Sequence, residues 1–235
     1  MSLTYATFTT GLANLMGQVL ATDPNFVTML PNAIDYAEQR IYRDLDLIET
    51  VVRDTKALTI NSRTVNLPST FGIFVVVEGI NLLVGGVRTA VLAPVSREFI
   101  DMIYPSDTAA TSPSYPQYFG MLSDQTILVA PPPDGAYTVE VVGRTRPTSL
   151  SLTNTTTVLT NNFPDLFLAA AMIFSSGYKQ NFSATGDDPR SAMSWEQQYT
   201  LLLASAAREQ TRKRFASTSW SSKQQDAAPA PLRPE

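Results

Sequence analysis

The stretch that decides the fold is Leu166-Phe167-Leu168-Ala169-Ala170-Ala171-Met172-Ile173-Phe174, nine residues without a polar break. At 3.6 residues per turn its apolar side chains fall on every face of a helix, so the whole circumference needs cover. The run is far shorter than the ~20 residues that span a bilayer, so we expect protein to cover it. Pro164 suits the first turn of a helix, where a backbone N–H is not needed. The side chain of Asn161 or Asn162 can accept a hydrogen bond from an open backbone N–H at the start of this helix. The sequence therefore predicts a buried helix over residues 163–180.

Amphipathic helices on both sides of this stretch are the expected cover. Apolar residues at steps of three and four predict helices at residues 5–20, 24–46 and 189–215, of which the second has the clearest stripe. The third has a stripe suited to antiparallel packing against the buried helix. The side chains expected to form this bundle core are Ile34, Ile41, Leu45, Phe167, Phe174, Trp195, Tyr199 and Leu202.

Between these helices the period changes from helical to strand-like. Residues 50–60 and 63–67 predict a hairpin around Asn61-Ser62, and residues 73–84 and 87–92 predict a second around Gly85-Gly86. Ser96 can cap a short helix that ends before Pro105. Three further strands are expected at 117–121, 126–130 and 136–144, joined by a turn at Ser123-Asp124 and by the proline run 131–135.

The order of elements, helices then strands then helices, predicts an α+β fold. We expect a discontinuous antiparallel helical bundle, made by the N-terminal helices and the C-terminal helix pair, with an inserted, mainly antiparallel β domain. The expected boundaries are 1–49 and 160–215 for the bundle and 50–150 for the β domain. Residues 147–162 are expected to be a polar connector. Residues 216–235 are rich in Ser, Gln, Ala and Pro, which predicts a flexible C-terminal tail.

Composition narrows the function. The chain of 235 residues contains no His and no Cys, which removes the usual catalytic triads, thiolate and imidazole metal sites and disulfides. Its net charge of −4 gives no general basic surface for gripping nucleic acid. Residues 1–11 lack the pattern of a secretory signal, so we expect synthesis and assembly in a cytoplasm.

Several short motifs occur in an order typical of one family. They are Ala37-Glu38-Gln39-Arg40-Ile41-Tyr42-Arg43-Asp44-Leu45, Val65-Asn66-Leu67-Pro68-Ser69-Thr70-Phe71, Tyr115-Pro116-Gln117-Tyr118-Phe119, the stretch 127–137 with its Pro-Pro-Pro-Asp-Gly turn, and Arg146-Pro147-Thr148-Ser149-Leu150-Ser151. Over residues 5–215 the chain resembles the head-to-tail adaptor proteins of short-tailed bacteriophages.

That resemblance implies a structural virion protein without catalysis or cofactor. It implies a homo-oligomeric ring, a dodecamer, beneath the portal protein and above a tail or nozzle protein, located in the virion neck and not in a membrane. Genomic DNA would pass through the ring without sequence-specific binding. We expect acidic or neutral residues to line such a channel, because they repel the phosphates of the passing duplex.

The C-terminal helix ends in a basic cluster that is the candidate portal-binding segment. In the alternative interpretation, these cations only offset the negative C-terminal end of the helix dipole, and the tail after them is solvated. In a third interpretation, they contact the phosphates of DNA. The candidate portal-binding residues are Arg208, Arg212, Lys213, Arg214, Phe215 and Trp220.

Two other functions remain open at this stage. A tail or decoration module that binds a glycan would expose Tyr115, Tyr118 and Phe119 as a flat patch. A small cell-wall hydrolase would need a carboxylate pair, for which the candidates are Asp35, Glu38, Asp44 and Asp46. The three-residue spacing of Asp35 and Glu38 also fits a solvent-exposed helix face that they would share with Arg40 and Arg43.

Overall fold

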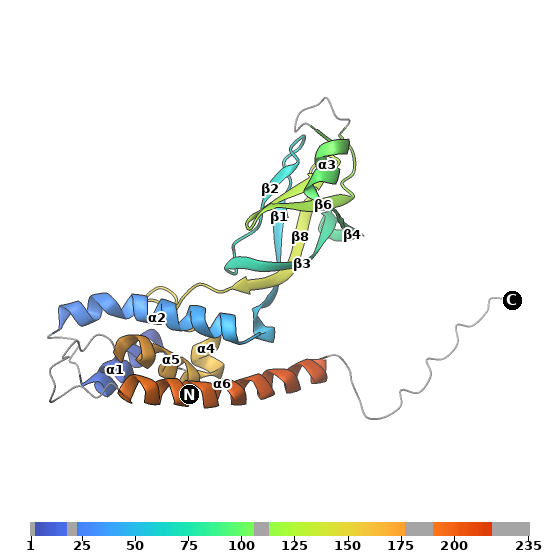
Figure 1. The fold of residues 1–235 in the computed structure, drawn as a ribbon. Coiled ribbons are helices and arrows are strands. Elements are labelled where there is room, and N and C mark those ends of the chain that lie inside the picture. Colours follow the sequence, from blue (N-terminus) through green and yellow to red (C-terminus); the bar gives the residue numbers. More distant parts are fainter. Residues whose placement is uncertain (1–2, 18–22, 106–112, 177–189, 218–235) are drawn as a thin grey trace, which may run out of the picture.

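The computed structural model describes residues 3–17, 23–105, 113–176 and 190–217. Figure 1 shows two parts: most helices lie together at one end, and the strands, with one short helix among them, project from them at the other. The helices share one apolar core, and most of the buried strand residues share another. The predicted α+β class is confirmed.

The first part, which we call the helical part, is built around the apolar stretch 166–174. This stretch lies in α5, which contacts α1, α2, α4 and α6, and Figure 1 shows it between α2 and α6. Its alanines, Ala169 to Ala171, are buried and allow neighbouring helices to approach closely. On α1, Phe8 stacks on Phe167 with ring centroids 4.3 Å apart. The helices are α1 (Tyr5–Met16), α2 (Pro24–Asp44), α4 (Val158–Asn162), α5 (Pro164–Ser176) and α6 (Arg190–Ser217).

The expected bundle-core residues fall into three groups. Ile34, Ile41, Leu45, Phe167 and Tyr199 are buried, and Trp195 and Leu202 are partly buried against the same core. Phe174 differs from the prediction because 36% of its surface is exposed. It lies on the last turn of α5, where its ring centroid is 5.7 Å from that of Tyr36 on α2.

The second part, the β part, contains two four-stranded sheets with the orders β1-β8-β3-β4 and β2-β7-β6-β5. All pairs are antiparallel except the two-residue pair β5–β6. The short helix α3 (Arg97–Ile103), capped by Ser96 as predicted, packs against β6 and β7. The strands are β1 (Val51–Ala57), β2 (Thr64–Asn66), β3 (Ile73–Val84), β4 (Val87–Val91), β5 (Ala93–Pro94), β6 (Tyr118–Ser123), β7 (Thr126–Ala130) and β8 (Thr138–Arg146).

Local turn signals predicted two of the strand pairings correctly. β3 and β4 form the hairpin around Gly85 and Gly86, whose φ angles of 58° and 80° need glycine's freedom. β6 and β7 pair as predicted, but their turn lies at Asp124-Gln125, one residue later than expected, because Ser123 still pairs with Thr126. The predicted pairing of residues 50–60 with 63–67 is wrong, because β1 pairs with β8 and β2 pairs with β7. The chain does turn at Asn61, but each strand pairs with a distant one in a different sheet.

The segment expected to be a polar connector contains the extra helix α4. Thr157 accepts a hydrogen bond from the backbone N–H of Thr160, and the Thr160 hydroxyl accepts one from the N–H of Thr157. This capping box uses threonine at the position where Glu or Gln normally marks the motif, so its sequence signal is weak. Leu150 and Leu159 bring this segment into the helical core.

Candidate functional site: the junction between helices and strands

The chain crosses between the two parts twice, after α2 and after β8, and the end of α6 reaches the first crossing. There the 3₁₀ helix η1 (Ile48–Thr50) leads into β1. Gln210 of α6 is 2% exposed; its Oε1 accepts a hydrogen bond from the N–H of Ile48 at 3.1 Å, and its Nε2 donates to Glu49 at 3.1 Å. Lys213 donates to Glu49 at 2.8 Å and pairs with Glu209 at 2.9 Å. The last turns of α6 therefore hold the first crossing in place.

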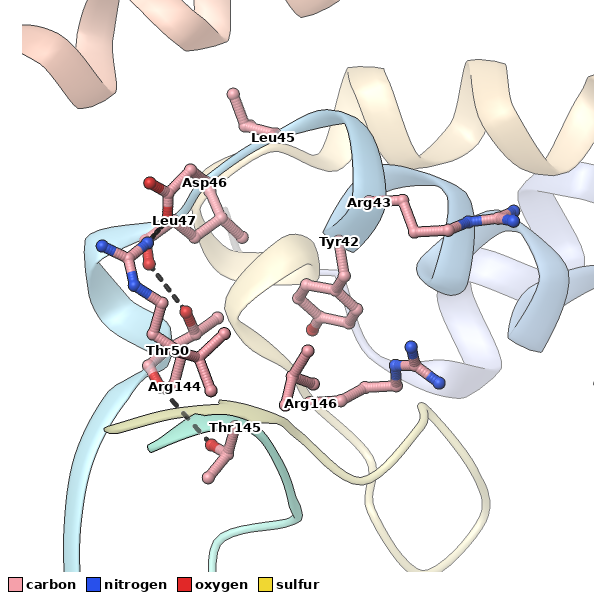
Figure 2. Close-up of a pocket in the computed structure, with 11 residues that line it drawn as sticks. Tyr42, Arg43, Leu45, Asp46, Leu47, Thr50, Arg144, Thr145 and Arg146 are labelled. Atoms are coloured by element: carbon pink, nitrogen blue, oxygen red, sulfur yellow. Dashed lines mark hydrogen bonds and ion pairs between the residues drawn. The ribbon is translucent and has the colours of Figure 1, made fainter. Parts of the chain in front are cut away.

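A chain of charged groups continues from this point to two strands of the first sheet. Arg214 of α6 donates to the backbone carbonyl of Asp46 at 2.7 Å and pairs with its carboxylate. Asp46 also pairs with Arg144 of β8, as Figure 2 shows, and Arg144 donates to Glu78 of β3 at 3.1 Å. Asp46, in the first crossing, thus links α6 to β8, and β8 is the strand that leads into the second crossing.

The electrostatics of this cluster follow from its contacts. Burial alone would raise the pKa of the Glu49 carboxyl, but hydrogen bonds from Lys213 and Gln210 outweigh burial and lower it. Hydrogen bonds to Glu209 and Glu49 raise the pKa of the Lys213 ammonium. Both groups therefore stay charged across the physiological range.

A second set of contacts joins α6 to α2. The Arg40 guanidinium donates two hydrogen bonds to the Glu196 carboxylate, one of them at 2.9 Å, and lies 4.3 Å from the centroid of the Tyr199 ring. The Tyr199 hydroxyl donates to Asp44 at 2.7 Å. The hydrogen bond from Arg40 lowers the pKa of Glu196, and burial together with the bond to Asp44 raises the pKa of Tyr199.

These contacts divide the predicted portal-binding residues. Lys213 and Arg214 are engaged within the chain, so they are not free cations at the helix end. Arg208 and Arg212 are exposed and form no ion pair with any residue that the structure describes. Phe215 is 55% exposed, and Trp220 lies outside the described residues. The sequence shows four neighbouring cations, but it gives no sign that Asp46 and Glu49, some 165 positions away, take two of them.

A cleft of about 460 Å³ opens beside the charged cluster. Figure 2 shows Tyr42 pointing from α2 toward β8, where the Arg146 side chain lies below it. At the back of the cleft the Thr145 hydroxyl and the Thr50 carbonyl are 3.5 Å apart. The cleft is lined by Tyr42, Arg43, Leu45, Asp46, Leu47, Thr50, Val75, Val76, Arg144, Thr145 and Arg146.

Of the four candidate carboxylates, Asp46 lines this cleft and the other three do not. Glu38 is 1% exposed and accepts hydrogen bonds from the backbone N–H of Leu150 at 3.2 and 3.3 Å, so it fastens the second crossing to α2. Burial raises the pKa of Glu38 to about 7. Asp35 accepts a hydrogen bond from the Ser149 hydroxyl at 2.9 Å. Asp44 accepts a hydrogen bond from Tyr199 of α6, and Asp46 pairs with Arg214, so all four acids serve contacts between segments.

The proposed glycan-binding patch is also absent from the described surface. Phe119 is buried in the strand core. Tyr115 meets the ring of Tyr137 edge-on, and Tyr118 meets Phe99 in the same way at a different place. The three aromatic rings therefore do not form one flat, exposed surface.

Metal-binding clusters and membrane-spanning helices are two further features that bear on function. Among the described residues, no group of three or more acidic side chains is arranged to hold a metal ion. In the same ranges, no helix combines the length and apolar character needed to cross a bilayer.

The family model described as SU10 adaptor protein matches residues 3–225, which include the helices on both sides of the strands. The chain belongs to the SU10 adaptor protein family. SU10 adaptors are phage head–tail adaptors, which confirms the resemblance drawn from the motifs. This family consists of structural proteins and is not a class of enzymes. No curated protein matches the sequence.

Membership in the family gives the junction a context. A head–tail adaptor works in the virion neck, with a portal on one side and tail proteins on the other. A protein that connects two neighbours needs a defined geometry between the parts that meet them. In this SU10 adaptor, the contacts of Asp46, Glu49 and Glu38 fix both crossings between helices and strands.

Proposed function

We propose that this SU10 adaptor forms a dodecameric ring beneath the portal, joins the capsid to the tail and leaves a passage for genomic DNA. The observation that carries this proposal is the family match over residues 3–225. The ring would assemble in the host cytoplasm and become part of the neck. The two-part architecture fits this role, because one end can meet the portal side while the other meets the tail.

The exposed face of α6 is our candidate for the portal contact. Leu201, Arg208, Arg212 and Phe215 follow one another at steps of seven, four and three, which puts them on one side of the helix. Leu201 is 74% exposed, and none of the four positions is acidic. Apolar and cationic side chains together fit an acidic partner surface with an apolar centre. We retain Trp220, which lies outside the described residues, as a candidate anchor and assign Lys213 and Arg214 to the junction.

Binding to the purified portal tests this proposal. The double variant R208A/R212A should bind the portal at least about tenfold more weakly, because two cations leave the contact. Its melting temperature should match that of the wild type, since neither side chain has a partner within the described chain. R53A/R88A, which removes two exposed arginines from the β part, is the matched control and should bind normally.

Native mass spectrometry of the same mixtures measures the stoichiometry. We expect a portal-bound dodecamer with the wild type and with R53A/R88A, and dissociated monomers with R208A/R212A. A wild-type protein that stays monomeric in the presence of the portal would refute the ring. A ring that forms equally well with R208A/R212A would leave the ring standing and refute the α6 contact.

We also propose that acidic or neutral residues line the DNA passage. The net charge of −4 supports this, because a conduit must not retain the duplex that moves through it. The purified protein should show no binding to duplex DNA in a filter assay at physiological salt. A ring structure with rows of Lys and Arg facing its axis would contradict this part of the proposal.

A further inference from the structure

Two side chains that line the cleft at the junction have polar atoms without a partner in the described part of the chain. The hydroxyl oxygen of Tyr42 and Nε of Arg146 are both buried, and neither makes a hydrogen bond with any residue that the structure describes. A buried donor without an acceptor costs about 1–3 kcal/mol, so such groups normally meet a ligand, a water molecule or a partner. Burial also raises the pKa of the Tyr42 phenol, which keeps its proton available for donation. Two side chains in the lining of the cleft therefore each have a donor that meets no acceptor among the described residues.

The charge of the lining indicates what the acceptor should be. Arg43, Arg144 and Arg146 line the cleft against a single acidic residue, Asp46. Asp46 is already occupied by Arg144 and by Arg214. Arg146 forms no ion pair with any described residue. The cleft thus retains positive charge that an anion would neutralise.

The walls restrict the kind of anion. Leu45, Leu47, Val75 and Val76 give the cleft aliphatic sides, and Val75 and Val76 are 61% and 49% exposed. A phosphodiester backbone offers no apolar groups for these walls and is repelled by the net negative chain. A protein segment can supply both chemistries at once, a carboxylate for the donors and aliphatic side chains for the walls.

We propose that this cleft binds an acidic peptide segment of a partner protein, with one Asp or Glu carboxylate accepting hydrogen bonds from Tyr42 and Arg146. The aliphatic neighbours of that carboxylate contact Val75 and Val76. The site is distinct from the exposed face of α6, so it can be occupied whether or not the ring contact proposed above is correct. Because the cleft lies between α2 and β8, its occupant would contact both parts of the adaptor.

The test uses a short peptide, acetyl-SVEVS-amide, and the full chain. Arginine Nε–Hε resonances are recorded by NMR, and that of Arg146 is assigned by its loss in R146K, which keeps the charge. We expect the peptide to shift this resonance saturably, while acetyl-SVQVS-amide, which lacks the carboxylate, binds about tenfold more weakly or less. Y42F keeps this resonance and is titrated in the same way, whereas R146K lacks it and is titrated by isothermal calorimetry beside the wild type. Each variant should bind the peptide severalfold more weakly, since each removes one donor.

R88K is the matched control, because Arg88 lies on β4 and does not line the cleft. It should bind the peptide like the wild type, and all variants are compared at temperatures where they are folded. Equal binding of the two peptides would refute the carboxylate. A larger shift with inorganic phosphate or a 12-base-pair duplex would assign the cleft to nucleic acid and overturn the proposal. No shift with any probe would mean that water alone satisfies the two donors, which would also overturn it.

Discussion

Ionisation of Glu38 should lower the free energy of unfolding of the protein. Burial raises its pKa from 4.5 to about 7, so the folded protein keeps its proton where the unfolded chain has lost it. Its contribution to the free energy of unfolding is therefore full below pH 4.5, falls as the pH rises toward 7, and is lost above that. The two values correspond to a loss of on the order of 3 kcal/mol.

We predict that Glu38→Gln removes this pH dependence. The glutamine carbonyl can still accept from the N–H of Leu150, but no charge has to be buried. Urea unfolding from pH 4.5 to 8 should show the variant gaining stability relative to the wild type as the pH rises. Glu98→Gln, at an exposed site on α3, is the control and should leave the slope unchanged. Parallel curves for wild type and E38Q would contradict the prediction.

The hydroxyl of Tyr199 gives a second test at this scale. Tyr199 is 1% exposed, and Tyr199→Phe removes only its hydrogen bond to Asp44. We expect a loss of about 1–2 kcal/mol in urea unfolding, the lower end for a bond to a charged group because Asp44 is partly solvated. Tyr36→Phe changes the same atom on a ring that is 54% exposed and should have no measurable effect. A similar loss in both variants would argue against a specific role for the Tyr199 bond.

Which residues are buried could be predicted, but which partners they meet could not. The 3.6-residue period of α2 placed Ile34 and Ile41 inward, because a stripe has only one side that can face a core. Lys213 and Glu49 carried no such signal. A charge pairs with whatever the tertiary structure brings near it, and the sequence does not record that these two positions meet.

Among the elements, α6 has two faces that should respond differently to the same kind of mutation. The face with Lys213 and Arg214 binds the first crossing, while Arg208 and Arg212 form no ion pair with any described residue. We predict that K213A/R214A loosens residues 46–50, with about tenfold faster hydrogen exchange at the amide of Ile48. The loss in unfolding free energy should be only about 1 kcal/mol, because these ion pairs are partly exposed.

R208A/R212A is the matched control for this experiment, since it removes the same charge from the same helix. It should leave exchange at Ile48 as in the wild type. If both double variants raise hydrogen exchange at Ile48 equally, then the net charge of α6, and not the contacts of Lys213 and Arg214, holds the first crossing in place. Raising the salt concentration should reproduce part of the effect of K213A/R214A, because salt screens exposed pairs.

The prediction of elements succeeded where the signal was local. The helix start at Pro24, where Asp23 caps α2, and the hairpin turn at Gly85-Gly86 were placed correctly. The pairing of β1 with β8 depends on contacts some 90 residues apart, so the turn at Asn61 could not reveal it. α4 was missed because its capping box is built from two threonines.

At the scale of the whole molecule, the α+β class followed from the order of elements, whereas the arrangement of the two sheets did not. Propensity distinguishes strands from helices, but it does not say which strand borders which. The membership of the two apolar cores also changes where we place the C-terminal boundary of the proposed inserted β domain. Leu150 packs with the helices, so we propose that the inserted unit ends near Arg146 and not at residue 150.

The inserted unit should fold without the helices. Its apolar core is separate from that of the helical part, and its ends lie side by side, because Val51 and Arg144 are direct partners in the β1–β8 ladder. We predict that a fragment of residues 51–146 gives the circular dichroism of a β protein and unfolds cooperatively in urea.

A chain in which these residues are replaced by a short Gly/Ser linker should stay helical, since paired backbones of an antiparallel ladder are only about 5 Å apart. Each should be less stable than in the full chain, because the bond between Asp46 and Arg144 is lost. A fragment without a cooperative transition would mean that the strands depend on the helical part, and that the two parts form one folding unit.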